Sequence, residues 1–162
     1  MPFDAYLKLA GVDGEATRKG FEKQMEIFSF SFGASNPSTI GTAGGGGGAG
    51  KVSISSFNIM KKNDKASAEL FKHCCSGEHF DSATVTLNKS GGKESVDFLK
   101  YEFEKVFIDS IQWSGSSGGD DTPTESISLS YGKVTITYTG QSDKGGKAEN
   151  IVASWNVQTN TP

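Results

Sequence analysis

The chain has little material for covalent cross-links. Its 162 residues include only two cysteines, Cys74 and Cys75, and these are adjacent in the sequence. Neighbouring Cα atoms lie about 3.8 Å apart, which is too close for a relaxed disulfide between the two side chains. A small secreted scaffold held together by disulfides is therefore excluded, and stability has to come from an apolar core.

Long apolar runs and a strong charge of one sign are missing as well. The longest apolar runs are only a few residues, as at 106–108, so we predict no membrane insertion. The net charge is -3 at pH 7 without a basic stripe, so we expect no nucleic-acid partner. Residues 1–8 have neither the basic nor the apolar region of a secretory leader, so any export is expected to need no cleaved signal peptide.

Residue types that carry catalysis or bind metals are scarce. The only two histidines, His73 and His79, lie close to the cysteine pair, which raises the question of a zinc site. Adjacent cysteines on a helix point about 100° apart, so they cannot both serve well in one tetrahedral site. Two histidines around one short segment also provide little for a serine–histidine–aspartate relay. We therefore predict no catalytic residue, no metal site and no cofactor, and we do not expect an enzyme.

What the chain has in abundance is period-two alternation between apolar and small polar residues. The segments with this pattern are 28–32, 83–87, 127–131, 134–138 and 151–157. Such alternation predicts antiparallel strands with one face on a core and one towards water. The phase shifts at 27–28, 54–57, 103–106 and 108–111, which predicts β-bulges and a curved sheet. The expected fold is mainly β, an antiparallel partial β-barrel of two curved sheets, in a single domain over residues 1–162.

A single segment has helical periodicity instead. Between residues 64 and 75, apolar side chains recur every three or four positions, with charged side chains on the opposite face. Asn63 or Asp64 is expected to cap the N-terminus, and Gly77 is expected to end the helix in the left-handed conformation. We predict one short α-helix, at about 64–75, that packs on the sheet.

Glycine is concentrated rather than spread along the chain. There are 21 glycines, well above the roughly 7% of average proteins, and five are consecutive at 44–48. Residues 34–50 have no periodicity, and a loop of this length is normally functional or disordered. Residues 45–51 match the G-x-x-x-x-G-K pattern of phosphate-binding loops, but Val52 and a predicted strand follow where that pattern requires a hydroxyl and a helix. We predict a long Gly-rich loop without a nucleotide site.

Four strings of residues occur together in a recognisable order. They are FDAYLKL at 3–9, GVDGE at 11–15, EIFSFSFG at 26–33 and PTESISLSYGKV at 123–134. Together they resemble the Hcp family, the haemolysin-coregulated proteins that form the inner tube of the bacterial type VI secretion system. The likeness covers nearly the whole chain, and the first and last strings are specific when they occur together.

The resemblance implies a structural tube subunit. Family members form hexameric rings that stack into a tube, which a contractile sheath propels with a VgrG-type spike protein at its tip. They are themselves secreted and can carry small effector proteins in the lumen of the ring. By this resemblance the chain assembles in the bacterial cytoplasm and is then exported, to the medium or into a target cell, without a cleaved signal peptide.

The resemblance also assigns individual residues to the tube. By analogy with the family's lumen-lining strand, Ser29 and Ser31 are expected to face the channel and to contact effectors. Phe28, Phe30 and Phe32 are then expected to fill the core of the subunit. A polar strand face suits this role, because the interior of a wide barrel is filled with water.

The Gly-rich loop at 34–50 matches in position the family's extended loop, which reaches towards a neighbouring subunit or ring. The residues expected to make such contacts are Asn36, Pro37, Ile40, Gly44, Gly48 and Gly50. The five consecutive glycines depart from what the resemblance leads us to expect. Ordering them would cost roughly 1–2 kcal/mol per residue in backbone entropy, so we expect the loop to become ordered only when rings stack.

One alternative stays open at this point, a monomeric β-barrel module that binds a ligand such as a carbohydrate or a peptide. Such a module would be expected to expose a cluster of aromatic side chains. The two tryptophans, Trp113 and Trp155, fall in phase with core positions of their strands, which disfavours this alternative. The mass of the protein in solution separates the two hypotheses, because a ring has six subunits and a module has one.

Overall fold

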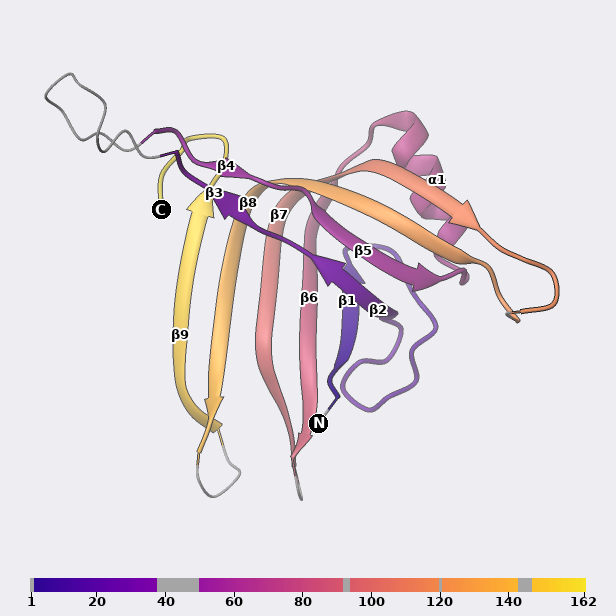
Figure 1. Ribbon diagram of the computed structural model, residues 1–162, viewed down its shortest axis with the longest axis horizontal. Helices are drawn as coiled ribbons and strands as arrows, with labels where there is room; N and C mark the ends of the chain where they lie inside the picture. The colour runs from indigo at the N-terminus through magenta and orange to yellow at the C-terminus, as the bar shows by residue number, and fades with distance from the viewer. Residues whose placement is uncertain (1, 38–49, 92–93, 120, 143–146) are drawn as a thin grey trace, which may run out of the picture.

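The computed structural model describes residues 2–37, 50–91, 94–119, 121–142 and 147–162 (Figure 1). The prediction of a mainly β protein with one short helix is confirmed, with 59% of the described residues in strands and 7% in the helix. The strands are β1 (Asp4–Leu9), β2 (Met25–Ser31), β3 (Ala34–Ser35), β4 (Ser53–Ile54), β5 (Phe57–Lys62), β6 (Phe80–Gly91), β7 (Glu94–Ser114), β8 (Thr124–Gln141) and β9 (Lys147–Asn156). The helix is α1 (Ser67–Ser76).

The main sheet is antiparallel and closes on itself. Its strands follow the order β5-β2-β1-β6-β7-β8-β9, and β5 also pairs with β8, so six of the strands form a barrel. Strand β8 is long enough to have two partners on its second side. Its residues 124–129 pair with β5, and its residues 133–141 pair with β9, which therefore lies outside the barrel. The predicted partial barrel is confirmed, and this pairing of β5 with β8 is what closes it.

The core fills the inside of the barrel and is rich in aromatic rings. Phe57 and Phe103 are fully buried, with ring centroids 5.0 Å apart, and Tyr101 lies against Phe57 at 5.3 Å. Burying one such ring contributes roughly 1.5–3 kcal/mol relative to leaving it in water. The inward positions of the alternating segments therefore supply the stability that the chain cannot obtain from disulfides.

Bulges occur at two of the four places where the alternation changes phase, and a third, 54–57, is the break between β4 and β5. The register shifts between Ile27 and Ser29 in β2 and between Ile108 and Ser110 in β7. At 103–106 the pairing of β7 with β8 continues without a shift, and the phase changes at Lys105, which adopts φ 53°. A residue in the left-handed conformation can therefore turn the side chains that follow it to the opposite face of the sheet, as a bulge would.

The bulge in β2 corrects one prediction. Phe28 is the extra residue of the bulge and is 55% exposed, so its predicted place in the core is wrong. Ile27 takes the inward position instead and is buried. Phe30 and Phe32 pack against the core as expected, and Phe30 stacks on Phe57 with centroids 5.6 Å apart. The phase shift at 27–28 located the bulge, but the Phe-x-Phe-x-Phe pattern did not show that Phe28 is the residue that the bulge adds.

Helix α1 begins three residues later than predicted and packs against β7. Its N-cap is Ala66, which has no side chain for capping, so the expected cap at Asn63 or Asp64 is wrong. Asp64 instead closes the preceding turn, where its Oδ1 accepts the Ala66 N–H at 2.9 Å. The predicted end is confirmed, because Gly77 has φ 74° and its N–H donates to the His73 carbonyl. No helix in the described part of the chain is long and apolar enough to span a membrane.

The segment predicted as a Gly-rich loop begins and ends in an ordered ladder. Strand β3 lies inside the predicted loop and pairs with β4, and the Gly50 N–H donates to the Pro37 carbonyl at 3.1 Å. We call residues 34–37 and 50–54 the arm. Figure 1 shows the arm at the upper left of the molecule, beyond the ends of the barrel strands. Ile40, Gly44 and Gly48 lie outside the described residues.

Candidate functional site

Four neighbouring strands present a continuous outward face, which we call the four-strand face. It consists of β2, β5, the first part of β8 and the last part of β7, paired in that order. Residues that point away from the core align across these strands in two rows. One row is Ser29, Met60, Ser126 and Gln112, and the other is Ser31, Asn58, Ser128 and Ser110.

The four-strand face is polar and carries no charge along its two rows. All members except Met60 are serine, asparagine or glutamine. Ser128 donates from its hydroxyl to Asn58 Oδ1, and Asn58 donates from Nδ2 to the Ser56 carbonyl at 3.3 Å. Hydroxyls and amides of this kind are well solvated, and without charge they hold neither cations nor anions strongly. The two rows are therefore well hydrated and offer no strong binding site for a charged group.

The predicted residues Ser29 and Ser31 are both exposed on this face. The structure brings them together with Ser126, Ser128 and Asn58, which sequence reasoning did not join to them. The alternation at 126–130 also predicts an outward face of small polar residues. The sequence does not show which strand pairs with which, so this face could not be joined to Ser29 and Ser31. Whether the two serines face a channel depends on assembly and remains a prediction.

Both lateral edges of the four-strand face are unpaired within the described residues. On one side, residues 28–31 of β2 pair with β5 alone, because β1 pairs only with residues 25–27. On the other side, residues 107–114 of β7 pair with β8 alone, because the pairing with β6 ends at Val106. Unpaired N–H and C=O groups at such edges can accept a strand from another chain.

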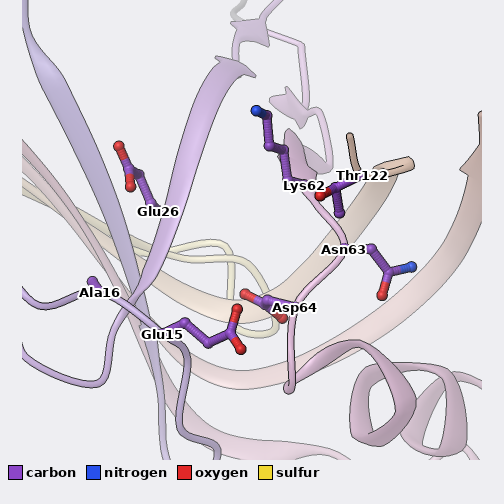
Figure 2. A pocket seen from close by; sticks show the side chains of 7 residues that line it. All are labelled: Glu15, Ala16, Glu26, Lys62, Asn63, Asp64 and Thr122. Atoms are coloured by element: carbon purple, nitrogen blue, oxygen red, sulfur yellow. The ribbon is translucent and has the colours of Figure 1, made fainter. Parts of the chain in front are cut away.

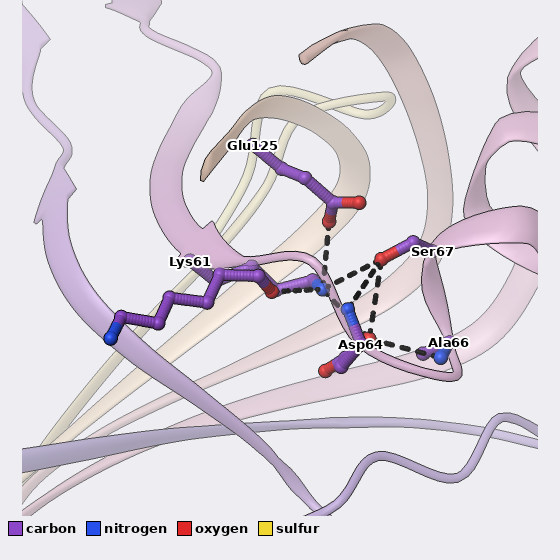
Figure 3. A network of polar contacts seen from close by, with 6 residues as sticks. Lys61, Asp64, Ala66, Ser67 and Glu125 are labelled. Carbon is purple, nitrogen blue, oxygen red and sulfur yellow. Dashed lines mark hydrogen bonds and ion pairs between the residues drawn. The ribbon is translucent and has the colours of Figure 1, made fainter. Parts of the chain in front are cut away.

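A buried ionic network lies behind this face, where β5 meets β8 (Figure 3). Lys61 and Glu125 are cross-strand partners, and both side chains are fully buried, with Nζ 2.7 Å from Oε2. Lys61 Nζ also lies 2.9 Å from Asp64 Oδ1 and 3.4 Å from Ser67 Oγ at the start of α1. A slip of one residue between the strands would turn Lys61 outward, so the network specifies the register of the barrel closure.

One end of the four-strand face is hollowed into what we call the end groove. It consists of two cavities of about 220 Å³ each that share Glu26 and Lys62. The apolar cavity is lined further by Ile27 and Phe28. The polar cavity is lined further by Glu15, Ala16, Asn63, Asp64 and Thr122. Figure 2 shows the Glu15 and Asp64 carboxylates directed towards the same space, and Lys62 lines both cavities, so the end groove carries charges of both signs.

At the opposite end, the base of the arm is fixed to the barrel. The Tyr131 hydroxyl donates to the Ser55 carbonyl at 2.8 Å. Burial raises the pKa of the Tyr131 hydroxyl above its ordinary value, so it stays a neutral donor over the physiological range. Gly33 and Ser55 also exchange two hydrogen bonds, from Gly33 N to Ser55 Oγ at 3.0 Å and from Ser55 N to Gly33 O at 2.9 Å.

The two histidines, His73 and His79, lie around a third cavity, with Glu69 and Asp81 among its lining residues. His73 Nδ1 lies 2.9 Å from the Glu69 carbonyl, and its ring stacks on Phe80 with centroids 4.2 Å apart. Within the described residues, no three histidine, cysteine or carboxylate side chains are grouped to hold a metal ion.

The tryptophans correct another expectation. Trp155 packs against the core, but Trp113 is 50% exposed, so its predicted core position is wrong. It lies against Phe71 of α1, which is 49% exposed, with ring centroids 5.5 Å apart. The phase of Trp113 was inferred correctly, but β7 extends past the end of the barrel core, so an inward-facing position there has only the helix above it. This aromatic pair points away from Gln112 and the four-strand face.

Comparison with known proteins gives one consistent family. The sequence profile described as “Type VI secretion system effector, Hcp” matches residues 6–138. Protein hcp1 of Pseudomonas aeruginosa is 33% identical over 161 residues, 99% of this chain and 98% of that protein. A solved structure described as “Structure of a type six secretion system protein” superposes with a TM-score of 0.93, at 33% identity over 99% of both chains. Hcp1 from Salmonella typhimurium superposes with a TM-score of 0.80, at 28% identity over 99% of both chains.

Proposed function

Because the chain belongs to the Hcp family of type VI secretion proteins, we propose that it is the subunit of hexameric rings that stack into the inner tube of the secretion machine. The observation that carries this proposal is the four-strand face with an unpaired edge on each side. The expected number of subunits in the ring is that of the family, and the way in which the ring closes is inferred from the two unpaired strand edges.

Ring closure follows from pairing the two edges between copies. Residues 28–31 of one copy add to residues 107–114 of its neighbour, which is a head-to-tail contact that closes when its rotation completes a circle. Strand direction supports this pairing. Four strands alternate in direction across the face, so β2 and β7 run antiparallel, and the alternation continues across every seam.

The closed ring places the four-strand faces side by side as the wall of a channel. In this arrangement Ser29 and Ser31 face the lumen, where a small effector would meet the hydroxyls and amides of the two rows. Cargo can slide along these two rows and be released, because the rows themselves offer no ionic contact. The role is mechanical and uses no catalytic residue or cofactor.

The remaining partners follow from the family. A tube of this kind works inside a contractile sheath and carries a VgrG-type spike at its tip. The subunit is then made and assembled in the bacterial cytoplasm and leaves with the tube, without cleavage of a signal peptide. It reaches the medium or a target cell together with its cargo.

Light scattering on a size-exclusion column, followed by electron microscopy of the main peak, tests the proposal. The expected result is a mass near six times 17.2 kDa and annular particles with a central channel. A protein that stays monomeric at high concentration and forms no annular particles would overturn the tube function. It would favour the alternative binding module, whose ligand would then be sought at the exposed Phe71–Trp113 pair.

A further inference from the structure

We infer that an apolar overhang at the far end of β7, β8 and β9 covers the seam between two copies of a ring by receiving the Phe71–Trp113 pair of the neighbouring copy. The overhang consists of Phe3, Phe98, Leu99, Tyr138 and Ile151. This inference rests on the proposed function and adds to the strand pairing a second layer of contact outside the channel. It is carried by the exposure of the two surfaces and by their places at the two unpaired edges.

The overhang is a part of the core-facing surface that the barrel leaves open. Leu99 of β7, Tyr138 of β8 and Ile151 of β9 are cross-strand neighbours in one row. Tyr138 follows the buried Val134 by four positions, so it points to the core side of the sheet. Tyr138 is nevertheless 49% exposed, and Ile151 is 63% exposed. Figure 1 shows the lower ends of β7, β8 and β9 extending past β2, which leaves this row uncovered in the described part of the chain.

The overhang begins at the unpaired edge of β2. Phe3 lies just before β1, with its ring centroid 6.4 Å from that of Phe30 on β2 and 6.1 Å from that of Phe98 on β7. Phe3 is 46% exposed. Residues 28–31 of β2 are the segment that β1 leaves unpaired. Apolar side chains therefore lead from this edge to the exposed row.

The Phe71–Trp113 pair occupies the opposite edge. Trp113 belongs to residues 107–114 of β7, which pair with β8 alone among the described residues. It points to the core side of the sheet, and Phe71 of α1 lies beside it with ring centroids 5.5 Å apart. Both side chains are about half exposed. Grouped apolar side chains that stay exposed in this way commonly mark a contact with another chain.

Pairing of the two edges brings these surfaces together. A ladder between two strands continues each face of the sheet, so the core side of β2 in one copy and the core side of β7 in the next become one surface. Phe3 of one copy and Trp113 of its neighbour then lie on the same side of the seam. The four-strand faces lie on the other side, which keeps this contact out of the channel.

The contact joins copies in the same head-to-tail sense as the strand pairing. Each copy has the overhang at one edge and the Phe71–Trp113 pair at the other, so every seam of a closed ring contains one of each. Both surfaces are exposed within a single copy, so they do not cover each other there. A second copy is therefore the partner that this arrangement fits.

The charged groups of the two regions are compatible with an apolar contact. Lys89 lies over the ring of Phe98, with Nζ 4.3 Å from the centroid, so it already covers part of that ring. The new contact therefore falls mainly on Phe3, Tyr138 and Ile151. Lys72 is exposed and points about 100° further round the helix than Phe71, so its charge stays in water. A tyrosine suits such a place, because its ring is buried while its hydroxyl stays at the wet rim.

Tryptophan fluorescence tests whether Trp113 becomes covered. The chain has only two tryptophans, so Trp155→Phe leaves Trp113 as the single source of emission. When subunits dissociated by dilution assemble into rings, the emission of this variant is expected to shift to shorter wavelength and its quenching by acrylamide to fall several-fold. Unchanged emission and quenching in rings of normal mass would overturn the inference.

Cross-linking tests which surface covers the pair. Two variants, both with Cys74 and Cys75 replaced by serine, carry Phe71→Cys or Ile151→Cys and are mixed before assembly and treated with a short bis-maleimide. The mixture is expected to give cross-linked dimers, and a chain with both changes a ladder of up to six subunits. Val152→Cys is the matched control, because Val152 is 60% exposed on the opposite face of β9 and should cross-link much less.

Substitutions test the contribution to ring stability. Trp113→Ser and Tyr138→Ser should each raise the concentration at which half of the subunits form rings by at least about tenfold, because each removes a large buried side chain from the seam. Val152→Ser should leave that concentration unchanged. Light scattering over a dilution series measures all three variants, and denaturant unfolding checks that each one folds.

The outcomes separate this inference from the proposed function. Rings of normal mass in which Ile151→Cys links to Phe71→Cys no more than Val152→Cys does would overturn the inference and leave the tube function intact. Equal ring-forming concentrations for Trp113→Ser and Val152→Ser would overturn it as well. A wild-type protein that forms no rings would instead overturn the proposed function.

Discussion

Lys61 and Glu125 face each other across the β5–β8 ladder, with Nζ 2.7 Å from Oε2 and both side chains fully buried. The pair lies on the core side of the four-strand face, one residue along from the exposed partners Met60 and Ser126. Because the same lysine also holds Asp64, the closure of the barrel and the start of the helix depend on one buried cation. The buried pair therefore specifies the register of the outward-facing residues of the four-strand face.

Removing the lysine alone should be costly. Lys61→Met leaves Glu125 buried without its partner, and breaking such a pair costs about 3–5 kcal/mol of the free energy of unfolding. The double variant Lys61→Met with Glu125→Leu removes both charges, together with the Glu125 Oε1 that has no hydrogen-bond partner among the described residues. It should therefore recover most of the loss. Denaturant unfolding measures both, and a double variant no more stable than the single would contradict this account.

Stability at alkaline pH should depend on Tyr131. Burial raises its pKa in the folded state above the ordinary value of 10.0, so the folded protein holds this proton more tightly than the unfolded chain. The contribution to stability is complete below pH 10 and is lost as the pH rises beyond it. Tyr131→Phe should therefore reduce the fall in the free energy of unfolding between about pH 10 and 12.

A second buried tyrosine gives an independent measurement. Tyr101, whose pKa burial also raises, should give a change in the same direction as Tyr131. Equal pH profiles for the wild type and Tyr131→Phe would contradict the prediction.

The channel assignment of Ser31 can be tested by labelling. A Ser31→Cys variant, made with Cys74 and Cys75 replaced by serine, should react several-fold more slowly with a bulky maleimide in assembled tubes than in dissociated subunits, because a channel wall is reached only through the tube ends. Lys72→Cys on the helix, away from the four-strand face, should be protected much less. Equal labelling rates at position 31 in the two states would count against the lumen.

Substitutions at two glycines, Gly50 and Gly33, test whether the close approach of the arm strands matters or only the flexibility of glycine. Gly50→Ala places a Cβ 2.8 Å from the Pro37 carbonyl oxygen and should force the arm strands apart, whereas Gly33→Ala meets nothing within 4 Å. We expect Gly50→Ala to weaken ring stacking with little change in the free energy of unfolding, and Gly33→Ala to preserve stacking. Electron microscopy and denaturant unfolding on the same samples measure the two effects, and equal stacking by both variants would remove the argument for a narrow arm.

The sequence alone determined the parts of this protein that depend on local periodicity. Alternation identified the strands and their polar faces, including Ser29 and Ser31, since side chains in a strand point to opposite sides in turn. Helical spacing identified α1, and Gly77 marked its end because glycine adopts positive φ without a steric cost. The family resemblance rested on strings of adjacent residues and needed no knowledge of the fold.

Only the tertiary structure decided which of these faces join. Ser29, Ser126 and Gln112 lie in one row through strand pairings between distant parts of the chain, and no local pattern specifies such pairings. The same holds for the burial of Lys61 against Glu125 and for the exposure of Phe28 and Trp113. Whether a side chain is covered depends on what packs over it, and that is a property of the folded neighbours rather than of the residue.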